Sequence, residues 1–187
     1  MKKIILSCWF LFVISASAQD NLVSAAKERL KHFVIYDGSY QSIAYPNGDV
    51  DKNRGVCSDV LIRSYRSLGK DLQQLVHEDM KANFSVYPKI WVLTKPDTNI
   101  DHRRVPNLET FFKRHGETLK ITNIASDYKP GDIVSWRLDN NLPHIGIVSD
   151  APSKSHPKRY KIIHNIGLGP QLNDMLFDFK IVGHYRY

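Results

Sequence analysis

The fold of this chain is organised around residues 54–62, which read RGVCSDVLI. A turn at Gly55 leads into the apolar residues of a helix, and Cys57 stands at the start of that helix. A thiol there meets free backbone N–H groups and the positive end of the helix dipole, which both favour the thiolate. The alternative is that Cys57 is a small core residue, since free cysteines are often buried.

A secretory signal peptide is predicted for residues 1–18. Two lysines precede an apolar run from Ile4 to Ile14, and Ala16-Ser17-Ala18 has the small residues of a cleavage site. The run is too short to span a membrane. A lipoprotein with a modified Cys8 is disfavoured, because Cys8 lies near the start of the apolar run rather than at its end.

Cleavage at this site leaves 187 − 18 = 169 residues, from Gln19 to Tyr187. That length suits one compact domain, expected to be a monomer without an integral membrane segment, exported to the periplasm or the extracellular space. Loss of Lys2 and Lys3 lowers the formal charge from +7 to +5. The basic residues are scattered, which is typical of a solvated surface. We therefore expect no nucleic-acid partner, while an anionic envelope polymer fits the charge.

The cysteine count favours a reactive thiol. Cys8 leaves with the signal peptide, so the mature chain keeps Cys57 alone and forms no internal disulfide. An unpaired cysteine in an exported protein indicates intermolecular pairing or a reactive group.

Helical patterns come first in the chain and strand patterns second. One expected helix is capped by Asp20 and presents Leu22, Ala26, Leu30 and Phe33 on one face. A second expected helix begins at Cys57 and ends at Gly69, and a third begins at Asp71. A short fourth helix is expected to be capped by Asn107 and to end at Gly116. The expected strands are 132–136, 144–149, 160–164 and 177–187. This order predicts an α+β domain, with N-terminal helices packed on an antiparallel sheet.

Two of the expected strands carry histidines. His144 opens an apolar strand, and the next strand ends in His164-Asn165. If the strands pair, an imidazole from each can face the Cys57 helix as base and orienter for a nucleophile. Only one of His164 and Asn165 can face that side, since side chains alternate along a strand. The pattern of residues leaves this choice open.

The chain contains KPGDIVSW at 129–136, HIGIV at 144–148 and IIH at 162–164, with Tyr45 upstream of Cys57. In these motifs it resembles the NlpC-type cell-wall cysteine peptidases of the papain superfamily. From Tyr36 onward the chain looks closest to a secreted bacterial group, the domain of unknown function 1287 family, including the segment DHRRVPNL at 101–108.

The resemblance implies a papain-like fold with Cys57 as nucleophile, His144 as general base and His164 as orienter. The implied activity is cleavage of an amide bond, most plausibly in the stem peptides of peptidoglycan, through an acyl-enzyme and without cofactor or metal. The Cys57 N–H, with the Tyr45 hydroxyl, is expected to hold the oxyanion.

Other residues are candidates for substrate binding. His102, Arg103 and Arg104 are candidates for binding a substrate carboxylate, with a solvated basic loop as the alternative. The NlpC-type pattern has an aspartate just before the cysteine and a glycine after the serine, whereas this chain has Val56 and Asp59. The bond preference of that family therefore does not transfer directly. Asp59 is a further candidate for the substrate site, although an acidic residue in a first helical turn also suits the helix dipole.

Three alternatives use the same residues. An acyltransferase would pass the acyl group to an amine or alcohol instead of water. A metal-binding module would use Cys57, His144 and His164 as zinc ligands, but their spacing matches no compact zinc motif. An inactive papain-like binding domain is disfavoured by the intact Cys/His/His set.

Overall fold

The computed structural model describes the backbone of residues 9–187 and the side chains of residues 18–187. Part of the expected signal peptide, with Cys8, therefore lies outside the described residues. The first helix, α1 (Trp9–Arg29), runs without a break through the expected cleavage junction after Ala18. None of the described helices is long and apolar enough to cross a bilayer.

Three more α-helices follow α1: α2 (Cys57–Ser67), α3 (Leu72–Asn83) and α4 (Val105–His115). Short 3-10 turns lie at Phe84–Val86 (η1), Asp101–Arg103 (η2) and Ala125–Asp127 (η3). A small parallel ribbon pairs β1 (Ile35–Tyr36) with β2 (Arg54–Gly55) just before α2.

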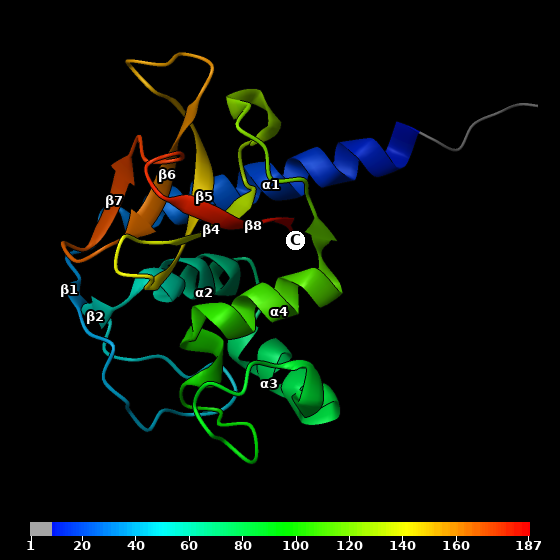
Figure 1. Cartoon of the computed structure of the whole chain (residues 1–187), viewed down its shortest axis with the longest axis vertical. Coiled ribbons are helices and arrows are strands. Elements are labelled where there is room, and N and C mark those ends of the chain that lie inside the picture. Colours follow the sequence, from blue (N-terminus) through cyan, green and yellow to red (C-terminus); the bar gives the residue numbers. More distant parts are fainter. Residues whose placement is uncertain (1–8) are drawn as a thin grey trace, which may run out of the picture.

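The main sheet has six strands in the order β3-β8-β4-β5-β6-β7, and each neighbouring pair is antiparallel. Its strands are β3 (Glu117–Thr118), β4 (Ile133–Arg137), β5 (Pro143–Pro152), β6 (Tyr160–Asn165), β7 (Pro170–Asn173) and β8 (Lys180–Arg186). In Figure 1, α2, α3 and α4 lie together beside the sheet. The predicted α+β architecture, with N-terminal helices packed on an antiparallel sheet, is confirmed.

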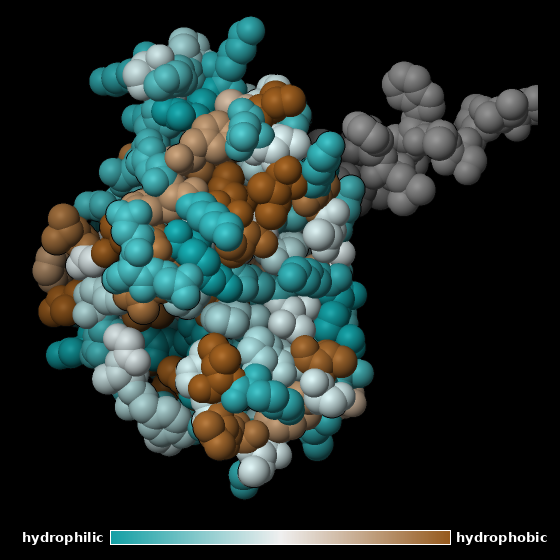
Figure 2. All heavy atoms as spheres, in the orientation of Figure 1, coloured by the Kyte–Doolittle hydropathy of each residue, from teal (hydrophilic) through white to brown (hydrophobic). Residues whose placement is uncertain are grey.

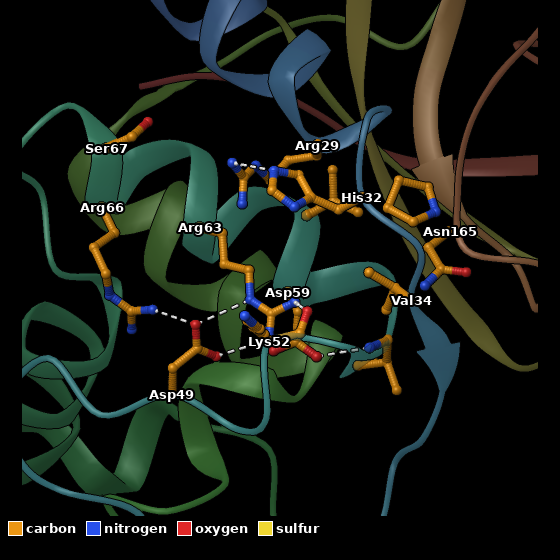
Figure 3. A pocket seen from close by; sticks show the side chains of 13 residues that line it. Arg29, His32, Val34, Asp49, Lys52, Asp59, Arg63, Arg66, Ser67 and Asn165 are labelled. Carbon is orange, nitrogen blue, oxygen red and sulfur yellow. Dashed lines mark hydrogen bonds and ion pairs between the residues drawn. The ribbon is translucent and has the colours of Figure 1, made fainter.

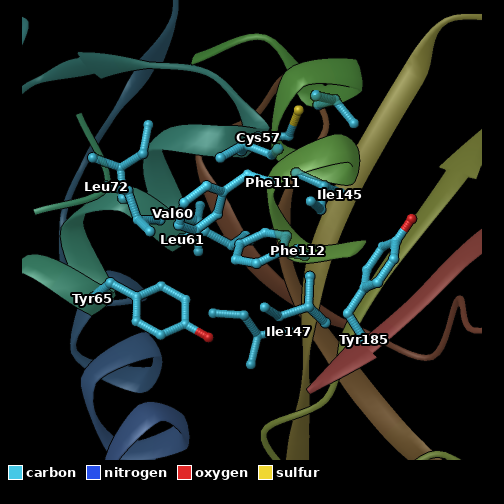
Figure 4. Close-up of a cluster of buried hydrophobic side chains, with 14 of the residues drawn as sticks. Cys57, Val60, Leu61, Tyr65, Leu72, Phe111, Phe112, Ile145, Ile147 and Tyr185 are labelled. Carbon is cyan, nitrogen blue, oxygen red and sulfur yellow. The ribbon is translucent and has the colours of Figure 1, made fainter. Parts of the chain in front are cut away.

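The sheet separates two cores. On the helix side, α2 buries its apolar face against Ile145 and Ile147 of β5 and the aromatic residues of α4 (Figure 4). On the other side, Trp136, Val148 and Ile162 pack with the segment before β8. Cys57 belongs to the helix-side cluster and is 4% exposed. The start of α2 is therefore fixed by packing against β5.

Several local expectations are confirmed. Asp71 caps α3 by accepting a hydrogen bond from the Gln73 N–H at 3.0 Å. Gly69 follows α2 with φ +79°, a left-handed conformation that glycine adopts without strain.

Three local expectations were wrong. Asp20 does not cap a helix, because α1 begins at Trp9 and runs through Asp20. Phe33 is 79% exposed, because α1 ends four residues earlier at Arg29. Asn107 does not cap α4: the helix already begins at Val105, and the Asn107 amide donates to the Asp101 carbonyl at 3.1 Å. Strand β7 was also missed, since four residues after a glycine-rich turn carry little periodic signal.

Candidate active site

A cavity of about 540 Å³ lies beside the start of α2, and Cys57 forms part of its wall. Tyr36 and Tyr40 line one side, Trp91 and Arg104 another, and the cavity extends to Pro143, the residue immediately before His144. Figure 2 shows this face of the molecule hollowed between the β4–β5 connection and the loops near the start of α4. The cavity therefore leaves open space beside the residue that carries the thiol.

Two groups from outside its own helix lie close to the thiol. The Ile145 backbone N–H and the Tyr36 hydroxyl are both near enough to Sγ of Cys57 to lower its pKa by hydrogen bonding. Tyr36 thus takes the place beside the thiol that was expected for Tyr45. Tyr45 instead packs edge-on against His77 of α3, with ring centroids 5.1 Å apart, and does not line this cavity. The expectation for Tyr45 was wrong, because the chain between Tyr45 and Cys57 folds into a separate loop while the β1–β2 pairing brings Tyr36 close.

The predicted low pKa of the thiol was also wrong for this state. Burial raises the pKa of Cys57 to about 11, although hydrogen bonds from the Ile145 and Ser58 backbone and from Tyr36 act in the opposite direction. Desolvation of a charge outweighs the helix N-terminus here. Cys57 is therefore a neutral thiol in the resting protein.

His144 and His164 meet across adjacent strands. The Nε2 atom of His144 lies 3.0 Å from Nδ1 of His164, with the rings nearly perpendicular. A glycine makes this possible: a Cβ at Gly146 would lie 2.7 Å from Ile162 and 3.1 Å from the Cβ of His164. The glycine of the HIGIV strand lets β6 approach closely enough for the two imidazoles to touch.

A third residue orients the pair. The side-chain oxygen of Asn173, on β7, lies 3.3 Å from Nε2 of His164. An amide oxygen only accepts, so Nε2 of His164 carries the proton and its Nδ1 accepts from Nε2–H of His144. This leaves Nδ1 of His144 with a free lone pair, the form that a general base needs. Asn173 gave no signal in the sequence, because its role depends on the pairing of β7 with β6.

Asn165 points elsewhere. Its side-chain oxygen accepts from the Gly167 N–H at 3.1 Å and so stabilises the turn before β7. Asn165 lines a different cavity, together with residues of α1 and α2. The structure therefore brings His164, and not Asn165, to His144. Within residues 18–187, no hydrogen bond joins Cys57 directly to His144; the thiol meets the next residue of β5, Ile145.

The basic segment expected to bind substrate is largely internal. Arg103 makes a bidentate ion pair with Asp59, at 2.9 and 3.0 Å, and both side chains are almost completely buried. Asp59 also accepts from the Val56 N–H at 2.6 Å, closing the first turn of α2. His102 and Asp59 are buried and do not line the cavity that holds Cys57, whereas Arg103 lines it with a guanidinium that Asp59 already binds. Contact of these three residues with a substrate stays a prediction.

Arg104 differs from its neighbours. It is only partly buried, stacks on the Trp91 ring at 4.1 Å, and lines the cavity that holds Cys57. Its ion pair with Asp101 leaves part of the guanidinium available. Arg103 also lines this cavity, but Asp59 already occupies its guanidinium, so Arg104 is the residue of the HRR sequence with more of its charge free.

The burial of two histidines predicts how the stability of the protein depends on pH. Burial lowers the pKa of His102 and of His144 to about 3, the latter also through His164, so both are neutral in the folded protein. In the unfolded chain both histidines take up protons near the ordinary histidine pKa of 6.5. The free energy of unfolding should therefore decrease as the pH falls from 6.5 toward 3. Each histidine should cost about 2 kcal/mol by about pH 5. Urea unfolding at several pH values tests this, and His102→Gln should flatten the profile. Equal stability at pH 7 and pH 5 would contradict it.

Comparison with known proteins places the chain in a family. The family described as "Domain of unknown function (DUF1287)" matches residues 23–187. The chain belongs to this family. It is 53% identical over 177 residues to the "Uncharacterized protein YijF" of Escherichia coli (strain K12), covering 94% of this chain and 85% of that protein. The predicted membership of the domain of unknown function 1287 family is confirmed.

A solved structure is also similar. NlpC1 from Trichomonas vaginalis matches with a TM-score of 0.49 and 16% sequence identity. The match covers 91% of this chain but 44% of that longer chain. The activity of the present chain has to be argued from its own residues.

Proposed function

We propose that this DUF1287 protein is a cysteine hydrolase that cleaves amide bonds in peptides, with Cys57 as nucleophile. The observation that carries the proposal is the thiol at the start of α2, in the wall of an open cavity, next to Ile145 of β5, with a hydrogen-bonded histidine pair that begins at the preceding residue, His144. A structural cysteine needs neither a cavity nor an imidazole pair oriented by an amide. No three metal-ligating side chains converge in the part of the chain that the structure describes, and the metal-binding alternative gains no support.

The mechanism begins from neutral groups. A substrate carbonyl enters the cavity, and Cys57 attacks it while its proton passes to Nδ1 of His144. The hydrogen bond to His164 holds the imidazole and spreads the positive charge that develops on it. His144 then protonates the leaving amine, and water, deprotonated by the same imidazole, releases the acyl group from the sulfur.

The proposed substrate is a peptidoglycan stem peptide, which carries a free carboxylate. The predicted export places the protein where that polymer is found, and Arg104 in the cavity suits a carboxylate. The Tyr36 hydroxyl, rather than that of Tyr45, is near enough to the sulfur to donate to an oxyanion. Transfer of the acyl group to an amine would need the same residues and a second substrate.

Incubation of the mature protein with purified peptidoglycan tests the function. Mass spectrometry should find new free carboxyl and amine ends in the stem peptides, and none with Cys57→Ala. Fragments joined by a new amide bond would instead identify transfer.

The histidine pair gives a prediction about the third catalytic position. His164→Ala should lower kcat strongly, by about 100-fold, whereas Asn165→Ala should leave kcat within about threefold, since only His164 orients His144. Steady-state kinetics on both folded variants measure this. A dead Asn165→Ala enzyme beside an active His164→Ala enzyme would reverse the assignment.

Arg104 gives a prediction about recognition. Arg104→Gln should raise KM about tenfold with little change in kcat, because the guanidinium binds the carboxylate in ground and transition states alike. Lys113→Gln, which removes an exposed charge from α4, is the matched control. An unchanged KM in Arg104→Gln would exclude this role.

A further inference from the structure

A second cavity, of about 310 Å³, lies on the other side of the residue that precedes Cys57. Val56 lines both cavities, but the remaining walls differ. This second cavity is enclosed by the end of α1, the loop before β2, the middle of α2 and the β6–β7 turn (Figure 3). None of the proposed catalytic residues lines it.

The walls of this cavity carry an excess of positive charge. Four cationic side chains line it, namely Arg29, Lys52, Arg63 and Arg66. The acidic side chains are Asp49 and Asp59, and Asp59 is already neutralised by Arg103 from outside the cavity. Four cations thus face one available carboxylate. The three arginines are partly buried, which costs free energy unless an anion compensates their charge, whereas Lys52 is exposed to solvent.

The pairing within the set shows which charges are free. Asp49 accepts from both Arg63, at 3.0 and 3.1 Å, and Arg66, at 2.9 Å. Arg63 also donates to backbone carbonyls of the loop before β2. Arg63 and Arg66 therefore stabilise that loop. Within residues 18–187, neither Arg29 nor Lys52 has an acidic partner.

Arg29 is the least satisfied of the four. Its Nη2 lies 3.2 Å from Nε2 of His32, a neutral acceptor at best, and its Nε is buried without any hydrogen-bond partner. The neighbouring acid, Glu28, is paired with Lys31. Burial and the positive charge of Arg63 lower the pKa of Arg29, and the negative charges of Glu28 and Asp49 oppose this shift only in part.

We propose that this cavity is an anion site that binds a phosphate group, held chiefly by Arg29 and Lys52. The cations approach from different walls of the cavity, so a tetrahedral oxyanion with acceptors in several directions fits better than a planar carboxylate. A phosphate monoester carries close to two negative charges near neutral pH, which matches the two unpaired cations. The site is separate from the thiol and does not depend on the proposed hydrolase activity.

Calorimetric titration of the mature protein with inorganic phosphate, at chloride-matched ionic strength, tests the site. Saturable binding of one phosphate is expected. Arg29→Gln and Lys52→Gln should each weaken it at least about tenfold, since each removes a charge-assisted hydrogen bond. Arg29→Lys should keep most of the affinity, and Lys81→Gln, an exposed charge on α3, should keep all of it.

Two further arms separate the possible ligands. Titration with glycerol phosphate shows whether the site prefers a phosphate ester or the free ion. Tighter binding of either one supports the site if Arg29→Gln abolishes that binding. Tighter binding of glutarate than of phosphate would overturn the assignment to phosphate. Equal loss of affinity in Lys81→Gln and Arg29→Gln, or no binding to the wild-type protein, would overturn the site itself. Cys57→Ala should bind phosphate normally, so failure of the hydrolase proposal leaves this test intact.

Discussion

Replacement of Cys57 by alanine should abolish peptide hydrolysis, with a loss of about 10⁴-fold or more in kcat/KM. The thiol supplies the atom that attacks the substrate carbonyl, and no neighbouring hydroxyl among the described residues is placed to replace it. The Tyr36 hydroxyl lies close to the same sulfur, and Ser58 is buried and donates to the Arg103 carbonyl. Release of fragments from peptidoglycan, measured by mass spectrometry, gives the readout.

Alkylation provides an independent measurement on the same residue. Because burial raises the pKa of Cys57 to about 11, iodoacetamide should label the free protein slowly near neutral pH and faster toward pH 11. Cys57→Ala should keep the thermal stability of the wild type to within a few degrees, since it removes one sulfur from the edge of the core. A folded Cys57→Ala variant with full activity would exclude the proposed mechanism.

Replacement of Asp59 by alanine should have the largest effect on stability. The change leaves the Arg103 guanidinium buried and unpaired beside α2, which costs about 3–5 kcal/mol. It also removes the acceptor for the Val56 N–H at the first turn of the helix. Both losses act on the turn that positions Cys57, so activity should fall together with stability.

Urea unfolding measures this effect as a lower midpoint with an unchanged slope. The matched control is Glu28→Ala, which breaks an exposed ion pair with Lys31 and should leave the midpoint where it was. The double variant Asp59→Ala/Arg103→Met should recover much of the loss, because it removes the stranded charge. A stable Asp59→Ala protein would show that Arg103 finds another partner.

The sequence alone predicted the features that local patterns encode. The apolar periodicity of residues 60–68, followed by Gly69, predicted the α2 helix and its end, and Asp71 predicted the start of α3. Short apolar runs beside His144 and His164 predicted two strands, and the family resemblance singled out these two histidines. These signals depend on spacing along the chain, which the printed residues contain directly.

Only the tertiary structure decided which distant residues meet. It placed Tyr36 rather than Tyr45 at the thiol, paired Arg103 with Asp59, and added Asn173 behind His164. It also showed that the pKa of Cys57 is raised rather than lowered. The sequence indicates where a helix begins, but it does not show how deeply the first residue of that helix is buried. Desolvation and ion pairing depend on what packs around a group from remote segments, and that packing is a property of the folded chain.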